Sequence, residues 1–157
     1  MNDKRELLRH FFGALAYRTQ KALRGAPDSF ADFRVLPGVR TPHELVHHMT
    51  GVLGYARTFV IGGKYRPEKQ PDFEAEIQQF HDMLESLSDH LKSGDPMRDT
   101  TEERMLQGPL ADAMSHAGQL AMLRRLHGSP IPPESFIVAD ISPDNLGPDQ
   151  PDPVSPD

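Results

Sequence analysis

The placement of the prolines restricts this chain to helices more than any other feature of its sequence. Eight of the fifteen prolines fall after Gly128, and the others lie between or at the ends of long stretches in which apolar residues recur every three or four positions. Proline interrupts helices and central strands, whereas that spacing puts apolar side chains on one face of an α-helix. The sequence therefore predicts helices up to Gly128 and extended chain after it.

Four helices are expected before Gly128. They are predicted at residues 2–23, 42–61, 71–94 and 109–128. Thr41 is the expected N-cap of the second helix, and Glu44 completes a capping box with it. A polar connector at 97–107 precedes the fourth helix. No convincing pair of strands is present, so the predicted fold is all-α, an antiparallel four-helix bundle.

The last part of the chain cannot form another helix or a central strand. Residues 129–157 contain eight prolines, each of which removes a backbone donor. Its apolar run at 136–141 is expected to dock on the bundle as an extended arm. We thus expect one domain over residues 1–141, the bundle with its docked arm, and a proline-rich segment at 142–157 that is flexible or packed on a partner subunit.

Composition excludes several classes of function. The 17 Lys and Arg against 23 Asp and Glu give a formal net charge of −6, and no basic run favours nucleic acid as a partner. No stretch suits a membrane span, and the N-terminus lacks the apolar core of a signal peptide. We therefore expect a cytoplasmic protein that binds neither nucleic acid nor membrane. Because the chain has no cysteine, a metal would need histidine, carboxylate or backbone ligands.

Polar side chains beside two of the apolar stripes indicate a site. His48 shares the core-facing stripe of the second helix, and Asp112 and His116 project together from the fourth helix because they are four residues apart. Buried without partners, such groups would cost on the order of a few kcal/mol each. They could share a divalent cation, such as zinc, nickel, iron or manganese. Alternatively, with Gln119 they could form a hydrogen-bonded group that only holds the bundle in register.

The runs TPHELVHHM at 41–49 and GPLADAMSHAGQLAMLRRLHG at 108–128 resemble the DinB-like superfamily. The resemblance covers about residues 3–128. It implies a four-helix bundle, commonly dimeric, with metal ligands from one histidine on the second helix and an H-x-x-x-H pair on the fourth. By this resemblance His48 and His116 bind the metal, and Asp112 stands in place of the first histidine of the pair. Gln119 would then orient a ligand or bind the substrate.

Some DinB-like relatives transfer low-molecular-weight thiols to electrophiles or isomerise substrates with the help of a thiol. The resemblance therefore implies a metal-dependent enzyme, a transferase or hydrolase, in which the ion activates a thiol or water against a small electrophilic substrate. The alternative is a non-enzymatic dimeric bundle that binds a small molecule or a partner. A homodimer is expected from the resemblance and from the proline-rich arm, which could cross to a second subunit.

A second motif overlaps the first. His43-Glu-Leu-Val-His47 fits the H-E-x-x-H pattern of zinc peptidases, and the run 85–89 could supply a distant third ligand. Against a metallopeptidase, Pro42 places His43 in the first turn, Glu44 already serves the capping box, and no strand edge is available for a peptide.

Other histidines are expected to play no part in a site. His47 is predicted to point away from the stripe that carries His48. His10, His81 and His90 have charged neighbours and are expected to be solvated.

Overall fold

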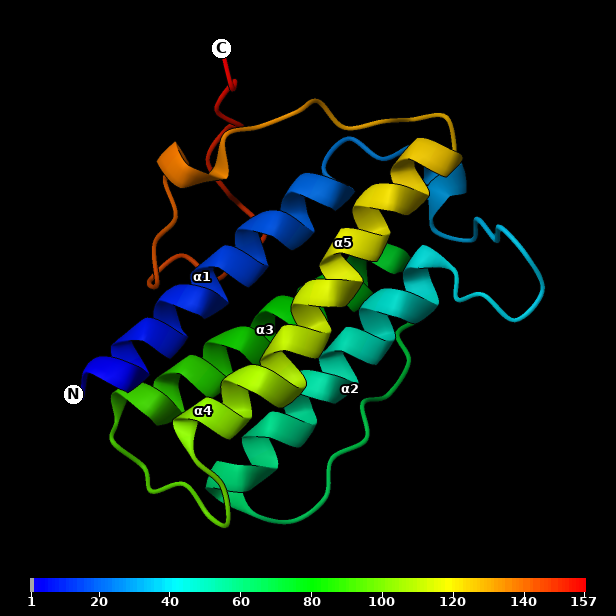
Figure 1. Cartoon of the computed structure of the whole chain (residues 1–157). Helices are drawn as coiled ribbons and strands as arrows, with labels where there is room; N and C mark the ends of the chain where they lie inside the picture. Colours follow the sequence, from blue (N-terminus) through cyan, green and yellow to red (C-terminus); the bar gives the residue numbers. More distant parts are fainter. Residues whose placement is uncertain (1) are drawn as a thin grey trace.

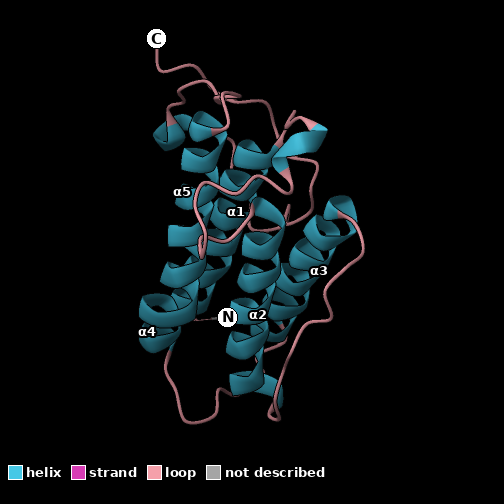
Figure 2. Ribbon diagram, turned by 90° about the vertical axis from the view of Figure 1, so that its right-hand side faces the viewer, coloured by secondary structure: helices cyan, strands magenta, loops and turns pink. Residues whose placement is uncertain are grey.

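The computed structural model describes residues 2–157, and over this range the protein is all-helical, without a strand. The long helices are α1 (Asp3–Leu23), α2 (Pro42–Ile61), α3 (Phe73–Lys92) and α5 (Ala111–Leu126). The short elements are η1 (Asp28–Phe30), α4 (Glu102–Met105), η2 (Leu106–Leu110) and η3 (Phe136–Val138). The long helices pack side by side, which confirms the predicted all-α bundle (Figures 1 and 2).

Capping side chains explain where the helices begin. The hydroxyl of Thr41 accepts a hydrogen bond from the Glu44 amide at 3.2 Å, and the Glu44 carboxylate accepts one from the Thr41 amide at 2.9 Å. The predicted capping box is thus confirmed. α3 begins two residues later than predicted because Asp72 is its N-cap. α2 ends at Ile61, and the next residue, Gly62, has a φ of 80°, which suits glycine.

The fourth helix begins earlier than predicted. The helical run starts at Glu102, where the Thr101 hydroxyl caps the Arg104 amide. Pro109, the predicted first residue, lies inside η2, which is a π-helical turn. Proline has no amide hydrogen and clashes with the carbonyl four residues earlier in an α-helix. The wider π turn accommodates the ring, so the chain continues from α4 into α5 without stopping.

The core lies between the four long helices. α2 packs most extensively on α3, and α1 on α5, while α2 also contacts α5 and η2. The fully buried side chains include Phe12, Leu15, Met49, Leu53, Leu84, Leu87 and Leu120. Contact between α2 and the η2–α5 run matters for function, because the predicted site residues lie on these elements.

The C-terminal segment, residues 129–157, passes over α1 and then doubles back (Figure 1). Within the run predicted to dock, Phe136 packs edge-on against Tyr17, but Ile137 is 93% exposed. Residues 142–157 were expected to be flexible or packed on a partner. Here Leu146 joins the core of this chain, and Gln150 is buried too.

His81 is buried, so the expectation that it is solvated is wrong. One ring nitrogen lies 2.8 Å from Gln20 Nε2 on α1, and Nδ1 lies 2.6 Å from the Leu146 carbonyl oxygen. The C-terminal segment covers α3 at this point, which neighbouring residues in the sequence could not indicate.

Candidate metal centre

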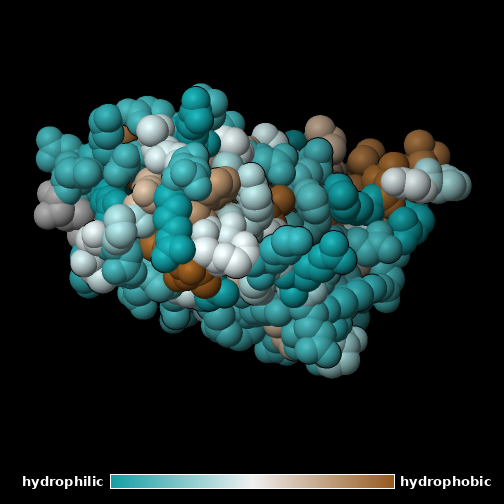
Figure 3. All heavy atoms as spheres, turned by 90° about the horizontal axis from the view of Figure 1, so that it is seen from below, coloured by the Kyte–Doolittle hydropathy of each residue, from teal (hydrophilic) through white to brown (hydrophobic). Residues whose placement is uncertain are grey.

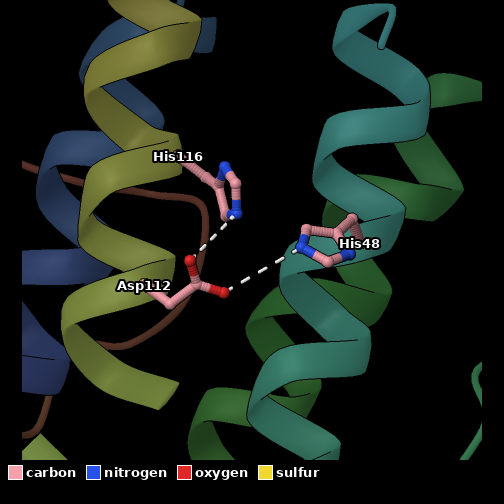
Figure 4. A group of neighbouring side chains, drawn as sticks. All are labelled: His48, Asp112 and His116. Carbon is pink, nitrogen blue, oxygen red and sulfur yellow. Dashed lines mark ion pairs between the residues drawn. The ribbon is translucent and has the colours of Figure 1, made fainter. Parts of the chain in front are cut away.

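His48, Asp112 and His116 converge between α2 and α5 (Figure 4). One ligand atom from each lies within 4.8 Å of the others. His48 Nε2 is 4.0 Å from Asp112 Oδ2, and His116 Nε2 is 3.3 Å from Asp112 Oδ1. Over residues 2–157, this is the one group of three histidine or carboxylate side chains that could hold a metal ion. The structure therefore brings together all three residues that the sequence singled out.

The chemistry of these atoms suits a divalent cation, and their separations are close to those that an ion would need. Metal–ligand bonds of about 2.1 Å, at tetrahedral or octahedral angles, separate ligand atoms by roughly 3.0–3.4 Å. The Asp112–His116 distance lies in this range, whereas His48, at 4.0 Å from Asp112, would have to move closer to the other two ligands when an ion binds. Two imidazoles and one carboxylate are ligands for zinc, nickel, iron or manganese. Three protein ligands also leave coordination positions open.

Gln119 sets the orientation of the His116 ring. Its Oε1 accepts a hydrogen bond from His116 Nδ1 at 2.8 Å. In the neutral ring Nδ1 therefore carries the proton, and Nε2 faces Asp112 with a free lone pair. Hydrogen bonds of this kind orient metal-binding histidines. The predicted neighbour of the site thus contacts one of its candidate ligands.

The surroundings of His48 favour the neutral form of its imidazole. Burial lowers the pKa of its imidazole below 6.5, and the positive charge of Arg40 lowers it further. Because a metal binds the neutral form of histidine, these surroundings favour a ligand role for His48.

The three side chains lie beside a cavity of about 940 Å³, two of them in its lining, His48 and Asp112. One face of α2 forms the floor of this cavity, the loop 62–72 forms one wall, and η2 with the start of α5 forms the other. Its size is that of a small-molecule site. The sequence did not predict this cavity, since its walls come from separate parts of the chain.

The absence of a side chain at Gly54 lets the loop wall approach α2. A Cβ atom at Gly54 would overlap the Tyr65 ring, and one at Gly51 would touch Pro67 at 3.6 Å. The loop is also tied to α3, because the Gln70 amide donates to Glu76 Oε2 at 2.8 Å. Glycines inside α2 were the available sequence signal for a close approach at this face.

The histidines of the H-E-x-x-H pattern contact a buried carboxylate. His43 Nε2 lies 3.2 Å from Glu76 Oε2, and His47 Nδ1 lies 3.0 Å from Glu76 Oε1. Glu44 is held by the Thr41 amide and by Arg34. His47, predicted to point away from the stripe that carries His48, faces Glu76 on α3 and also lines the cavity. These histidines fall outside the metal-capable group.

A scan against protein-family models, a search of curated proteins and a search of solved structures found no match to this chain. No helix among residues 2–157 has the length and apolar character of a membrane span.

Proposed function

We propose that the protein is a metal-dependent enzyme of the DinB-like type that acts on a small molecule in the cavity. The observation that carries this proposal is the convergence of three ligand atoms beside a cavity of about 940 Å³. A divalent cation held by His48, Asp112 and His116 would supply Lewis acidity, which makes a thiol or water nucleophilic near neutral pH. The reaction is thiol transfer to a small electrophile, or its hydrolysis or isomerisation.

The chain's own side chains have distinct parts in this proposal. Gln119 Oε1 accepts a hydrogen bond from His116 Nδ1, which keeps the proton on that nitrogen and leaves Nε2 free to bind an ion. Asp112 adds one negative charge where the DinB-like pattern has a neutral histidine. In thiol transfer, the sulfur bonds to the electrophilic carbon, the leaving group takes the bonding electrons, and the thiol proton passes to solvent. The antiparallel DinB-type topology, the cytoplasmic location and the homodimer belong to the same proposal, and rest on the sequence.

Metal analysis of untagged protein tests the proposal. We expect about one divalent ion per chain, lost in His48→Ala and in His116→Ala. His43→Ala is the discriminating control, because it removes a histidine of the H-E-x-x-H pattern without touching the proposed ligands. Circular dichroism would establish that each variant is folded. Loss of the ion in His43→Ala alone would instead support the metallopeptidase.

A second candidate is a non-enzymatic bundle that binds a small molecule or partner. It is favoured by one feature: the Asp112 carboxylate lies within 4.0 Å of both imidazoles, so a protonated ring could pair with it directly, without an ion. The two candidates differ in turnover. Metal-loaded protein with several thiols and a generic electrophile should show metal-dependent product if it is the enzyme. No such turnover, or no bound metal, would leave the binding bundle as the better account.

A further inference from the structure

The cavity beside the metal centre changes character along its length. The lining residues of α2 lie on one helical face from Glu44 to Tyr55, a distance of about 16 Å at 1.5 Å per residue. The loop wall runs antiparallel to α2 along the groove, since Tyr65 lies against Gly54 and Pro67 lies against Gly51. The metal ligand His48 is between the two ends. A molecule lying along this groove therefore meets a different environment at each end.

The end near the start of α2 carries two cations, Arg40 and Lys69. Over the described chain neither side chain makes a hydrogen bond or ion pair with another residue. The nearby carboxylate of Glu44 offsets only part of their charge, because it is also bound by Arg34 at 2.8 Å and by the Thr41 amide. The guanidinium of Arg40 is near enough to His48 for its charge to act on that imidazole. Both cations are thus available to a ligand.

The other end is apolar. It is lined by Val52, Tyr55, Pro67 and Pro109. Tyr55 is 56% exposed although its ring is a large apolar surface, and its one aromatic neighbour is Phe59, with ring centres 5.0 Å apart. An exposed aromatic face beside two prolines suits a hydrocarbon or aromatic group.

The charges at the Arg40 end of the cavity favour an anion. Arg40 and Lys69 contribute two positive charges, Asp112 contributes one negative charge, and Glu44 is offset by Arg34. The lining itself carries as many carboxylates as cations, but Glu44 is paired with Arg34 and Asp112 lies at the metal centre, so the end that holds Arg40 and Lys69 is positive. A positive end of this kind attracts anions.

We propose that the cavity binds a small amphipathic organic acid, whose carboxylate is held by Arg40 and Lys69 and whose apolar part lies along Val52 and Tyr55. The middle of the bound molecule then lies beside His48 and Asp112. This inference rests on the proposed function, since it names the class of substrate for the same cavity. Its two recognition elements do not depend on the ion.

The test compares 4-phenylbutyrate with its neutral amide by titration calorimetry, in metal-loaded protein and in His48→Ala. We expect the carboxylate to bind at least about tenfold more tightly than the amide in both proteins. Arg40→Gln and Lys69→Gln should each weaken carboxylate binding roughly tenfold and leave amide binding unchanged. Arg66→Gln is the matched control, because Arg66 is exposed on the same loop but is not part of the cavity lining. It should change neither affinity.

The outcomes separate this inference from the proposed function. Equal binding of carboxylate and amide, or an equal effect of Arg66→Gln and Arg40→Gln, would overturn the organic-acid inference even if the protein holds a metal. Preference for the carboxylate that disappears in His48→Ala would mean that the probe binds the ion, which would also overturn it. Arg40-dependent binding in a protein that holds no metal would support the inference and refute the metal-dependent enzyme.

Discussion

His81 lies where α1, α3 and the C-terminal segment meet, and there it has to be neutral. Its Nδ1 donates to the Leu146 carbonyl, and its other nitrogen accepts from the Gln20 side-chain amide. Burial lowers the pKa of this imidazole from 6.5 to about 4. The imidazole therefore binds a proton more weakly in the folded protein than in the unfolded chain. Protonation of His81 favours the unfolded chain, and the folded state is most stable when His81 is neutral in both states.

This linkage predicts a loss of stability in weak acid. Above pH 6.5 the free energy of unfolding is not reduced by His81. As the pH falls from 6.5 towards 4, the unfolded chain takes up a proton on His81 and the free energy of unfolding drops by about 3 kcal/mol. Urea unfolding at several pH values between 7 and 4 measures it. His81→Gln, which cannot titrate, should lose about that much less over the same interval. Parallel pH profiles for the two proteins would contradict the prediction.

Another buried titratable residue, Glu76, joins three parts of the fold. Its carboxylate has no exposed surface and lies against His43 and His47 of α2 and the Gln70 amide of the loop. A buried carboxylate is tolerated when its oxygens accept several hydrogen bonds. Contact with Glu76 therefore gives both histidines of the H-E-x-x-H pattern a structural role. Glu76 also anchors the loop wall of the cavity near Lys69.

At the scale of elements, the contact between α2 and the loop 62–72 predicts opposite effects for two glycine substitutions. In an open helical position, alanine is favoured over glycine by about 1 kcal/mol. Gly118→Ala on α5 meets nothing within 4 Å and should raise the free energy of unfolding by about that amount. Gly54→Ala would overlap the Tyr65 ring and should lower it by roughly 1–3 kcal/mol.

Urea unfolding of both glycine variants measures these changes in free energy. A displaced loop in Gly54→Ala would also move Pro67 and Lys69 away from the cavity, since both residues follow Tyr65 in the same wall. Stabilisation by both substitutions would mean that the loop does not pack on α2 as described.

At the scale of the whole molecule, exposed apolar side chains support the proposed homodimer. Most of the face seen from below is hydrophilic, with hydrophobic atoms in a few separate groups (Figure 3). On the C-terminal segment, Ile137 and Val138 are 93% and 62% exposed. Adjacent exposed apolar side chains are typical of a surface that another protein covers, and symmetric dimers are the commonest soluble assemblies.

Light scattering at tens of micromolar protein should therefore give twice the 17.6 kDa mass of one chain. Replacing Ile137 and Val138 together by serine should shift the protein towards the monomer without unfolding it, because neither side chain is buried in the chain itself. Serine at Leu7, another exposed apolar position far from these two in sequence, is the matched control. A wild-type monomer under these conditions would rule the homodimer out.

The sequence by itself determined the spans of α1, α2 and α3 to within two residues, and the three candidate ligands. A helix has a fixed period, so residue spacing alone places Asp112 and His116 on one face and puts His48 on an inward face. Capping chemistry is equally local, which is why the start of α2 at Thr41 was predictable. The early start of the fourth helix could not be predicted, because Pro109 lies inside a π turn and does not begin the helix as proline usually does.

Only the tertiary structure decided what surrounds those ligands. The loop 62–72 forms a cavity wall because Tyr65 packs on Gly54, and the C-terminal segment buries His81 by covering α3. Loops and extended segments have no period that ties spacing to direction, so their sequence does not tell which helix they will cross. Their paths depend instead on contacts between residues far apart in the chain, and these contacts form only when the whole bundle is assembled.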